Sequence, residues 1–467
     1  MTKVSSFYRA SYTQAIIIGF LSFLAPGIFS AIQGLGAGGL KTPTTANAAY
    51  ALSAGVLVIT APLSAVAANK FGLKPTLIFG TLGYAIYSAS LYENSRSGNQ
   101  WFLLFGAACS GLTGGPFWTA EAAVAVSYPE EKLRGRFIAT WQFLNKFGTI
   151  IAGAISLSLN IKGKTGGSVS LETYIVLFSL QCLAPFVSLL LSPPEKVIRS
   201  DGERVKTNIT DQTVGERFKD LWRVFTKKQI LFLSPGFLGA VWLGTWQGNY
   251  TAKYFSVRAR SLYSFATAIL CMFVDFIMGW LLDLKFRRSK KVQISWYAIV
   301  TIMTGYYIYA FIMQSKFDKN DPGAMDWNDP GFLRAYVPFL LFRIGVEAIF
   351  NWVYYCLGSI PLTPAEITIG VSLIRCCESL GQCLSFAVGA VNKSNMVNLS
   401  VSAAIFFACV PSVTYATTLC TDESPLVENE VDVNGDNESE IEIHVEKDDL
   451  KKSNVSVDVY PVENEKA

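Results

Sequence analysis

Ionisable side chains interrupt several long apolar stretches of this sequence, and they are the first candidates for chemistry. They are Lys146, Asp275, Arg343, Glu347, Arg375 and Glu378. A charged side chain at the centre of a lipid bilayer costs ~2.5–3.5 kcal/mol on insertion scales, so each one needs a partner or a function. In such a position acids and bases can bind a charged solute, carry a proton or neutralise one another.

Four of these charged groups are paired by their spacing. Arg343 and Glu347 are four residues apart, and Arg375 and Glu378 are three apart, so each pair shares one face of a helix. Gln382 lies one turn beyond Glu378 on the same face. Two interpretations carry equal weight: each pair stabilises helix packing by itself, or it faces a binding cavity.

Lys146 differs because no acid lies three or four residues away from it. We therefore predict a partner on another helix, with Glu347 and Glu378 as the candidates. In the functional hypothesis Lys146 binds the solute, or forms a charge pair that opens on binding, while one of these acids carries a proton. The predicted polar contacts come from Gln142, Asn145 and Gln382. For Asp275 a position away from the cavity is favoured.

The elements that must position these residues follow from composition. The chain has 467 residues, of which 51% are apolar and 16% are charged, against roughly 25% charged residues in an average soluble domain. Its apolar residues gather in runs of about 20 residues or more, the length that crosses a hydrocarbon core. The runs cover residues 10–35, 46–68, 74–92, 101–127, 136–160, 171–192, 230–250, 261–283, 292–314, 334–358, 361–391 and 396–420. The sequence therefore predicts an all-α polytopic membrane protein with 12 transmembrane helices.

The runs fall into two groups of six around a basic central stretch. We predict an N-terminal six-helix bundle at 1–192, a cytoplasmic loop at 193–229, a C-terminal six-helix bundle at 230–420 and a tail at 421–467. The N-terminal side holds 21 Lys and Arg against 11 on the other, which predicts that both termini are cytoplasmic. The stretch Arg217–Lys228 is predicted to be an amphipathic helix on the inner membrane surface. The tail has fifteen acids against four Lys, which predicts disorder.

The sequence gives no support to catalysis, cofactors or metal binding. Gly34–Gly39 resembles a dinucleotide-binding string only superficially, since no strand–helix–strand context surrounds it. The single histidine, His444, lies in the acidic tail, and none of the nine cysteines forms a CxxC pair. Basic residues lie in loops between apolar runs, so a lipid bilayer is the expected partner and nucleic acid is not.

A degenerate repeat links the two groups of runs. Ala65–Pro75 (AVAANKFGLKP) follows the second run, and Gly279–Arg288 (GWLLDLKFRR) follows the eighth. Both resemble the G-x-x-x-D-R-x-G-R-K loop signature of the major facilitator superfamily, although Asn69 replaces the acid of the first copy. Two copies at matching places fit the parallel-repeat architecture of those transporters. In this interpretation an inner latch joins neighbouring helix ends, and its residues are Lys70, Glu121, Arg134, Asp283 and Arg287.

Three further segments narrow the resemblance. They are Ala25–Gly39 (APGIFSAIQGLGAGG), Gly114–Arg136 (GGPFWTAEAAVAVSYPEEKLRGR) and Asn351–Tyr354 (NWVY). Together they resemble the fungal branch of the uncoordinated-ninety-three-like (Unc-ninety-three-like) family over most of residues 5–420. The resemblance implies the major facilitator fold. It leaves the activity open, since some members are described as channel regulatory subunits or as trafficking chaperones of receptors.

Two functions remain for this sequence. The first is a secondary transporter or facilitator of a small polar solute or ion, coupled to protons through a membrane acid and working by alternating access. The alternative is a non-transporting regulatory subunit or trafficking chaperone of other membrane proteins. The sequence does not separate plasma membrane from vacuole or other endomembrane. A monomer is the default for this architecture, with a partner membrane protein left open.

Overall fold

The computed structural model describes residues 7–129, 134–199, 205, 214–242, 244–284, 286–357, 364–391 and 394–420. Within these ranges every regular element is a helix, and the strand-like contacts are two isolated bridges, Ala10 with Ile198 and Phe255 with Met325. All of the described residues belong to one structural unit, Met1–Leu426. The acidic tail predicted at 421–467 lies outside the described residues.

The helices follow the apolar runs closely. The N-terminal part contains α2 (Ser11–Ser22), η1 (Phe23–Gly27), α3 (Ile28–Gly34), η2 (Ala37–Gly39), α4 (Pro43–Phe71), α5 (Leu73–Ser97), α6 (Gln100–Ser127), α7 (Arg134–Leu159), α8 (Leu171–Gln181), α9 (Ala184–Ser188) and η4 (Pro194–Lys196). The C-terminal part contains α10 (Val214–Phe225), α11 (Lys228–Val241), α12 (Gly244–Tyr254), α13 (Val257–Asp283), α14 (Arg288–Lys319), α15 (Phe332–Leu357), α16 (Pro364–Val391) and α17 (Asn395–Thr418).

Seven of the described helical segments are long and apolar enough to cross a membrane by length and composition. They are Ser11–Gly34, Pro43–Ser64, Leu171–Ser188, Lys228–Tyr254, Val257–Leu282, Arg288–Lys319 and Asn395–Thr418. The remaining apolar runs also form long helices, and among them α7, α15 and α16 carry all of the charged residues singled out by the sequence except Asp275, which lies on α13. Their charges are therefore placed inside the helix packing and not in loops.

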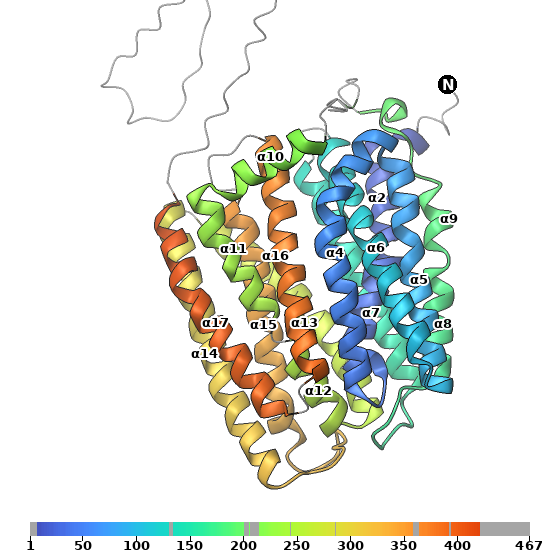
Figure 1. Ribbon diagram of the computed structural model, residues 1–467, viewed down its shortest axis with the longest axis vertical. Helices are drawn as coiled ribbons and strands as arrows, with labels where there is room; N and C mark the ends of the chain where they lie inside the picture. The colour runs from blue at the N-terminus through green and yellow to red at the C-terminus, as the bar shows by residue number, and fades with distance from the viewer. Residues whose placement is uncertain are drawn as a thin grey trace, which may run out of the picture. The chain divides into compact units, whose positions relative to one another are not determined.

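The N-terminal helices (blue to green) and the C-terminal helices lie next to each other, with α4 and α16 side by side where they meet (Figure 1). The same interface includes α13, which packs against α7 and α3. We call the end of this bundle that carries α10 the proximal end and the opposite end the distal end. The candidate site lies along the interface between the two sets of helices.

Several helices begin or end where a local sequence signal requires it. The Asn99 side chain accepts a hydrogen bond from the Phe102 amide at 3.1 Å and so starts α6. The Ser256 side chain accepts one from the Ala259 amide at 3.2 Å and starts α13. Each side chain satisfies an amide that has no partner within its own helix. Gly72, at φ +91°, separates α4 from α5 in a conformation that other residues rarely adopt.

The first membrane-length segment is not a regular helix. Between α2 and α3 lies a short π-helix, η1, which contains Pro26. Proline has no amide hydrogen, so a widened turn is a natural way to accommodate it. The turn packs closely on α7, since a Cβ at Gly148 would lie 2.6 Å from the Phe23 carbonyl oxygen. Glycine at this position lets the two backbones approach beside Lys146.

The amphipathic stretch of the central loop forms α10. This helix packs against α16 and α11 and lies across their proximal ends (Figure 1). Val224 is buried, and Leu221 and Phe225 pack against the C-terminal core. Phe218 and Trp222 are exposed on the other face. An exposed aromatic face beside basic residues suits a membrane surface, and that location remains a prediction.

Candidate functional site

Lys146 of α7 meets two acids from the C-terminal helices. Its Nζ donates a hydrogen bond to Oε1 of Glu347 on α15. The same nitrogen lies 3.7 Å from Oδ2 of Asp275 on α13. The exposed fractions of the side chains are 22% for Lys146, 30% for Asp275 and 10% for Glu347. The contact joins the N-terminal and C-terminal helices through a charge pair that is largely buried.

Further groups complete this arrangement. Nη2 of Arg343 lies 3.5 Å from Oε2 of Glu347 and donates to Sγ of Cys271 at 3.0 Å. Nδ2 of Asn351 donates to Oδ1 of Asp275 at 2.7 Å and to the Glu347 carbonyl oxygen at 2.9 Å. With the lysine, these contacts join two cations and two acids from three helices. We call Lys146, Asp275, Arg343 and Glu347 the Lys146 cluster.

The structure turns Asp275 toward the other charged residues, whereas the sequence interpretation favoured a position away from the cavity. The neighbouring residues Phe276, Ile277 and Trp280 are 76%, 51% and 61% exposed. They form the outward face of α13, while Asp275 is turned toward Lys146 and Asn351. A single apolar run gives no indication of which face packs inward, so the sequence could not place this acid.

A second group of polar residues lies on α16. Nη1 of Arg375 is 2.7 Å from Oε2 of Glu378, and Nε2 of Gln382 donates to Oε1 of Glu378 at 3.3 Å. The Arg375 guanidinium also lies 5.1 Å from the ring centre of Trp118 on α6 and 5.7 Å from that of Tyr354 on α15. An arginine over aromatic faces gains cation–π attraction. We call Arg375, Glu378 and Gln382 the Arg375 cluster, and its guanidinium touches aromatic rings from both sets of helices.

The structure does not bring every predicted polar contact to the clusters. Gln142 is exposed, and Asn145 is half-buried. Within the described ranges neither side chain is hydrogen-bonded to Lys146 or Glu347. Glu378 is likewise paired with Arg375 and not with Lys146. Of the two candidate partners of Lys146, the structure places Glu347 beside it.

Glu121 of α6 lies apart from both clusters and is completely buried. Its Oε1 accepts a hydrogen bond from the Ser22 hydroxyl on α2. The Trp141 indole of α7 donates to the same hydroxyl oxygen at 2.7 Å. Ser22 thus donates its single hydrogen to the acid while its oxygen accepts from the indole. The other carboxyl oxygen, Oε2, is buried and has no hydrogen-bond partner in the described part of the chain.

The predicted inner latch is only partly visible. Lys70 is exposed at the end of α4, with its ammonium 5.7 Å from the Phe71 ring centre. Arg287 is exposed as well. The side chains of Arg134 and Asp283 lie outside the described residues. Where the structure describes it, Glu121 contacts Ser22 and makes no ion pair with Lys70, so the latch remains a prediction.

The sequence interpretation missed an arginine at the distal end. Arg260, near the start of α13, is fully buried and donates to four backbone carbonyl oxygens of the N-terminal part. The distances are 2.7 Å to Leu35, 2.7 Å to Gly36, 3.3 Å to Leu40 and 2.7 Å to Gly167. The carbonyls of Leu35, Gly36 and Leu40 converge because the turn after α3 takes positive φ values at Gly36, Ala37, Gly38 and Gly39. We call this contact the distal clamp.

Other polar contacts also join the two sets of helices at this end. The Asn47 amide of α4 donates to Oδ1 of Asn249 on α12 at 2.9 Å. The Ser264 hydroxyl of α13 donates to the Ala31 carbonyl oxygen at 2.7 Å. The sequence signals this interface only through the glycine-rich turn at 36–39 and through Arg260, which lies early in a distant span. The distal end is thus closed by hydrogen bonds between buried groups.

An ion pair fixes the loop between α14 and α15. Arg258 donates through Nε to Oδ1 of Asp326 at 2.7 Å and through Nη2 to Oδ2, and the Ser256 hydroxyl donates to Oδ1 at 2.7 Å. The side chains of Arg258 and Asp326 are 9% and 10% exposed. These hydrogen bonds favour the charged carboxylate and lower the pKa of Asp326. The Arg258 guanidinium also lies 4.3 Å from the ring centre of Trp327.

This pair predicts a specific pH dependence. A carboxylate whose pKa is lowered on folding stabilises the protein above its unfolded pKa, about 3.9. That contribution is lost as the pH falls through the lower, folded value. We expect Asp326→Asn to cost ~1–3 kcal/mol near neutral pH, where charged hydrogen bonds are lost. The difference in melting temperature between wild type and variant should shrink steadily as the pH is lowered below the unfolded pKa of about 3.9. A difference that is constant with pH would contradict the assignment.

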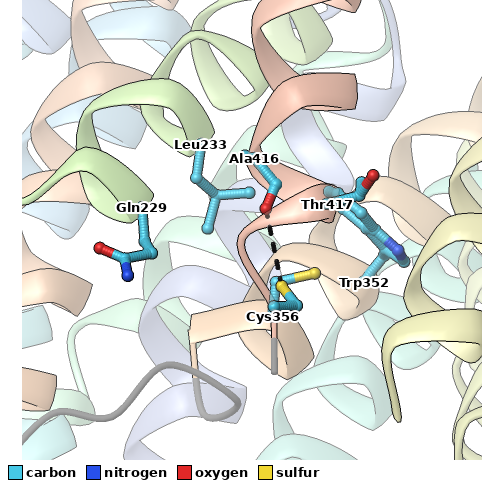
Figure 2. A pocket seen from close by; sticks show the side chains of 7 residues that line it. Gln229, Leu233, Trp352, Cys356, Ala416 and Thr417 are labelled. Atoms are coloured by element: carbon cyan, nitrogen blue, oxygen red, sulfur yellow. Dashed lines mark hydrogen bonds between the residues drawn. The ribbon is translucent and has the colours of Figure 1, made fainter. Parts of the chain in front are cut away.

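A small pocket lies elsewhere, near the proximal end of the C-terminal helices. It is lined by Gln229, Leu233, Trp352, Cys356, Ala416, Thr417 and Cys420 (Figure 2). Trp352 stacks on Trp296 at 4.9 Å between ring centres, and its indole donates to the Val292 carbonyl oxygen. The pocket contains none of the charged residues and is a packing gap beside these rings. Among the described residues no group of three His, Cys, Asp or Glu side chains is placed to hold a metal ion.

Comparison with known proteins identifies the family. Residues 15–386 match the Major Facilitator Superfamily. The chain belongs to the major facilitator superfamily. It is therefore a multi-pass membrane protein of a transporter family and not an enzyme, and the predicted all-α fold with 12 helices in two halves is confirmed.

Relatives narrow the family of this major facilitator protein. It is 30% identical to the notoamide biosynthesis cluster protein O' of Aspergillus versicolor, over 87% of this chain and 88% of that one. It is 27% identical to an UNC93-like protein of Schizosaccharomyces pombe, over 82% and 78% of the two chains. UNC93-like protein 1 of Arabidopsis thaliana is 25% identical, over 76% and 78%. The resemblance to the fungal UNC93-like branch is thereby confirmed.

Solved structures show the same fold for this major facilitator protein. The fucose:proton symporter of E. coli superimposes with a TM-score of 0.55 at 15% identity, over 87% of this chain and 98% of that chain. A D-xylose-proton symporter gives a TM-score of 0.60 at 11% identity, over 90% and 100%. At such low identity the likeness establishes the architecture and leaves the substrate open.

Proposed function

We propose that this protein is a secondary transporter or facilitator of a small polar solute or ion that works by alternating access. The observation that carries the proposal is the buried charge pair between Lys146 on α7 and Glu347 on α15, with Asp275 beside it. It joins the two sets of helices at their interface, the region where transporters of this fold place their binding sites.

Alternating access requires the two halves to move past each other, so contacts between them must open and form again. A charge pair is suited to this because a polar or charged solute can replace one partner while the halves part. The Arg375 cluster offers a second polar surface at the same interface, flanked by Trp118 and Tyr354. Fucose and xylose are the named solutes of two proton symporters with this fold, which supports a small polar solute and proton coupling.

The topology belongs to the same proposal. The excess of Lys and Arg on the side of the N-terminus supports cytoplasmic termini. In that orientation the proximal end faces the cytoplasm and the distal clamp faces the opposite side. The plasma membrane and the vacuole or another endomembrane both suit this arrangement. We take the monomer as the transporting unit.

Transport should be lost when the charge pair is broken. We expect purified protein in liposomes with an imposed pH gradient to take up one or more labelled monosaccharides, nucleosides or amino acids. Lys146→Ala and Glu347→Gln should each lower uptake by about tenfold or more, the equivalent of losing about 1.4 kcal/mol from a transport intermediate. Lys162→Ala and Glu172→Gln, which change exposed residues of the same types, serve as matched controls. Equal uptake by all four variants would exclude the pair from transport.

The second candidate is a non-transporting regulatory subunit or trafficking chaperone of other membrane proteins. One observation favours it: the two cations and two acids of the Lys146 cluster neutralise each other, as a purely structural network would. No movement of solute across the whole panel, from protein shown to be folded, would support this second function. Co-purification with one other membrane protein would then identify the partner.

A further inference from the structure

Glu121 is a buried acid that belongs to neither charge cluster and to no ion pair within the described ranges. Its side chain has no exposed surface, and its Oε2 has no hydrogen-bond partner within the described part of the chain. Oε1 receives one hydrogen bond, from the Ser22 hydroxyl. One neutral donor does not offset the cost of burying a carboxylate, which runs to several kcal/mol even after the protein relaxes.

The other two acids considered for proton binding have a different environment. Glu347 lies between Lys146 and Arg343, and Glu378 is paired with Arg375. Both acids therefore have a basic partner at ion-pair distance. Glu121 makes no ion pair with any described residue. Burial without an ion-pair partner favours the neutral, protonated form of this acid.

The charged and titratable groups around Glu121 come from four helices. On α6 itself, Trp118 lies one turn from Glu121. The Arg375 guanidinium of α16 lies 5.1 Å from the centre of the Trp118 ring. The Arg375 charge acts on Glu121, and both of these groups act on the buried Tyr84 phenol of α5. Lys70 on α4 and Arg136 on α7 are exposed. Among the described groups, Arg375 is the cation whose charge acts on Glu121, and it belongs to the opposite set of helices.

We propose that Glu121 is the proton-binding residue of this protein and that Arg375 is the cation that receives its carboxylate when the proton leaves. The assignment of a proton site rests on the geometry around Glu121. Its place in a transport cycle rests on the proposed function. It replaces Glu347 and Glu378 as the acid that carries the proton, because those acids are already neutralised by basic partners.

The exchange conserves charge. In the structure described, the O–H bond of neutral Glu121 is intact and Arg375 is paired with Glu378. When water reaches the site, that bond breaks and the proton passes to water. The new carboxylate attracts Arg375, which is then shared between Glu121 and Glu378, while Gln382 continues to donate to Glu378. Because Glu121 and Arg375 come from opposite halves, binding or release of a proton changes how strongly the halves attract each other.

Infrared difference spectroscopy tests the proton site without any need for transport. Full-length protein in lipid nanodiscs, titrated from acid to alkaline pH, should show the carbonyl band of a protonated carboxyl group at neutral pH. That band should disappear in Glu121→Gln, which preserves the acceptor for Ser22. It should persist in Glu347→Gln and Glu378→Gln. A band that survives in Glu121→Gln, or is absent from wild type at neutral pH, would overturn the proposal.

Two milder variants keep the test decisive if Glu121→Gln folds poorly. Ser22→Ala removes the hydroxyl that stabilises the carboxylate, and Arg375→Gln removes the cation that receives it. Each should move the midpoint of the band upward by about one pH unit, a tenfold change in proton affinity. An unchanged midpoint in both would refute the assignment. If the infrared band titrates as described but solute uptake does not depend on pH, Glu121 is a proton-binding site that does not couple protons to transport.

Discussion

Replacing Arg260 with alanine is expected to open the distal end of the bundle. The guanidinium is fully buried and donates to four carbonyl oxygens from two loops of the N-terminal part. Hydrogen bonds from a charged donor contribute ~1.5–3 kcal/mol each, and their acceptors would be left without partners. We therefore expect a loss of ~3–5 kcal/mol in stability, in the range seen when one member of a buried polar network is removed.

The measurement should separate opening from general unfolding. Hydrogen exchange should quicken in residues 35–40 and 163–170 of Arg260→Ala, while exchange in the helix centres changes much less. Arg260→Lys should lie between wild type and alanine, because an ammonium cannot reproduce the planar fork of a guanidinium. Arg334→Ala changes an exposed arginine and serves as control. If exchange quickened evenly along the chain, the arginine would be a general packing residue and not a clamp.

The second large effect concerns the Lys146 cluster. Glu347→Gln alone should destabilise the protein more than Glu347→Gln combined with Lys146→Met. The single change leaves two cations facing one acid, whereas the double change leaves Arg343 and Asp275, whose charges cancel. Close charge pairs show coupling energies of ~1.5–7 kcal/mol in double-mutant cycles at a protein interface. We expect a coupling of about 2 kcal/mol or more for Lys146 and Glu347.

Thermal unfolding of the two single variants, the double variant and wild type in one detergent measures this coupling. The matched cycle uses Arg343 and Glu347, whose atoms are 3.5 Å apart on one helix. Its coupling should be smaller, because pairs four residues apart contribute only ~0.2–0.5 kcal/mol on an isolated helix. Additive effects of Lys146→Met and Glu347→Gln, within about 0.5 kcal/mol, would show that the pair does not hold the halves together.

The sequence predicted the helices well because the signal for a span is local. Length and apolar composition locate a run such as 261–283, and α13 covers it. The same local reasoning identified Lys146 as a residue in need of a partner. It could not choose between Glu347 and Glu378, because that choice depends on the relative register of helices some 200 residues apart in the chain.

Features of the site that depend on packing between distant helices were not predictable. In the sequence, Arg260 looks like an ordinary residue at the end of a span. Its hydrogen-bond acceptors are backbone carbonyls, which no residue type in the sequence reveals. The apolar run around Asp275 does not show whether this side chain faces the helix packing or the outside. Glu121 suggested a latch with Lys70 because both lie near one end of the chain's spans. Its hydrogen bond to Ser22 arises from the packing of α2 against α6.

The π-helix in the first span ties two of these features together. An α-helix turns by about 100° for every residue, and a π-turn accommodates one residue more than a regular turn. Removing one residue from Phe23–Gly27 would restore a regular helix, but Ser22 would then point away from Glu121 while Gly27 kept its contact with α7. The widened turn and the buried acid are therefore coupled through Ser22. A chain without the acid would be free to straighten this helix, whereas this chain would lose the hydrogen bond to Glu121 by doing so.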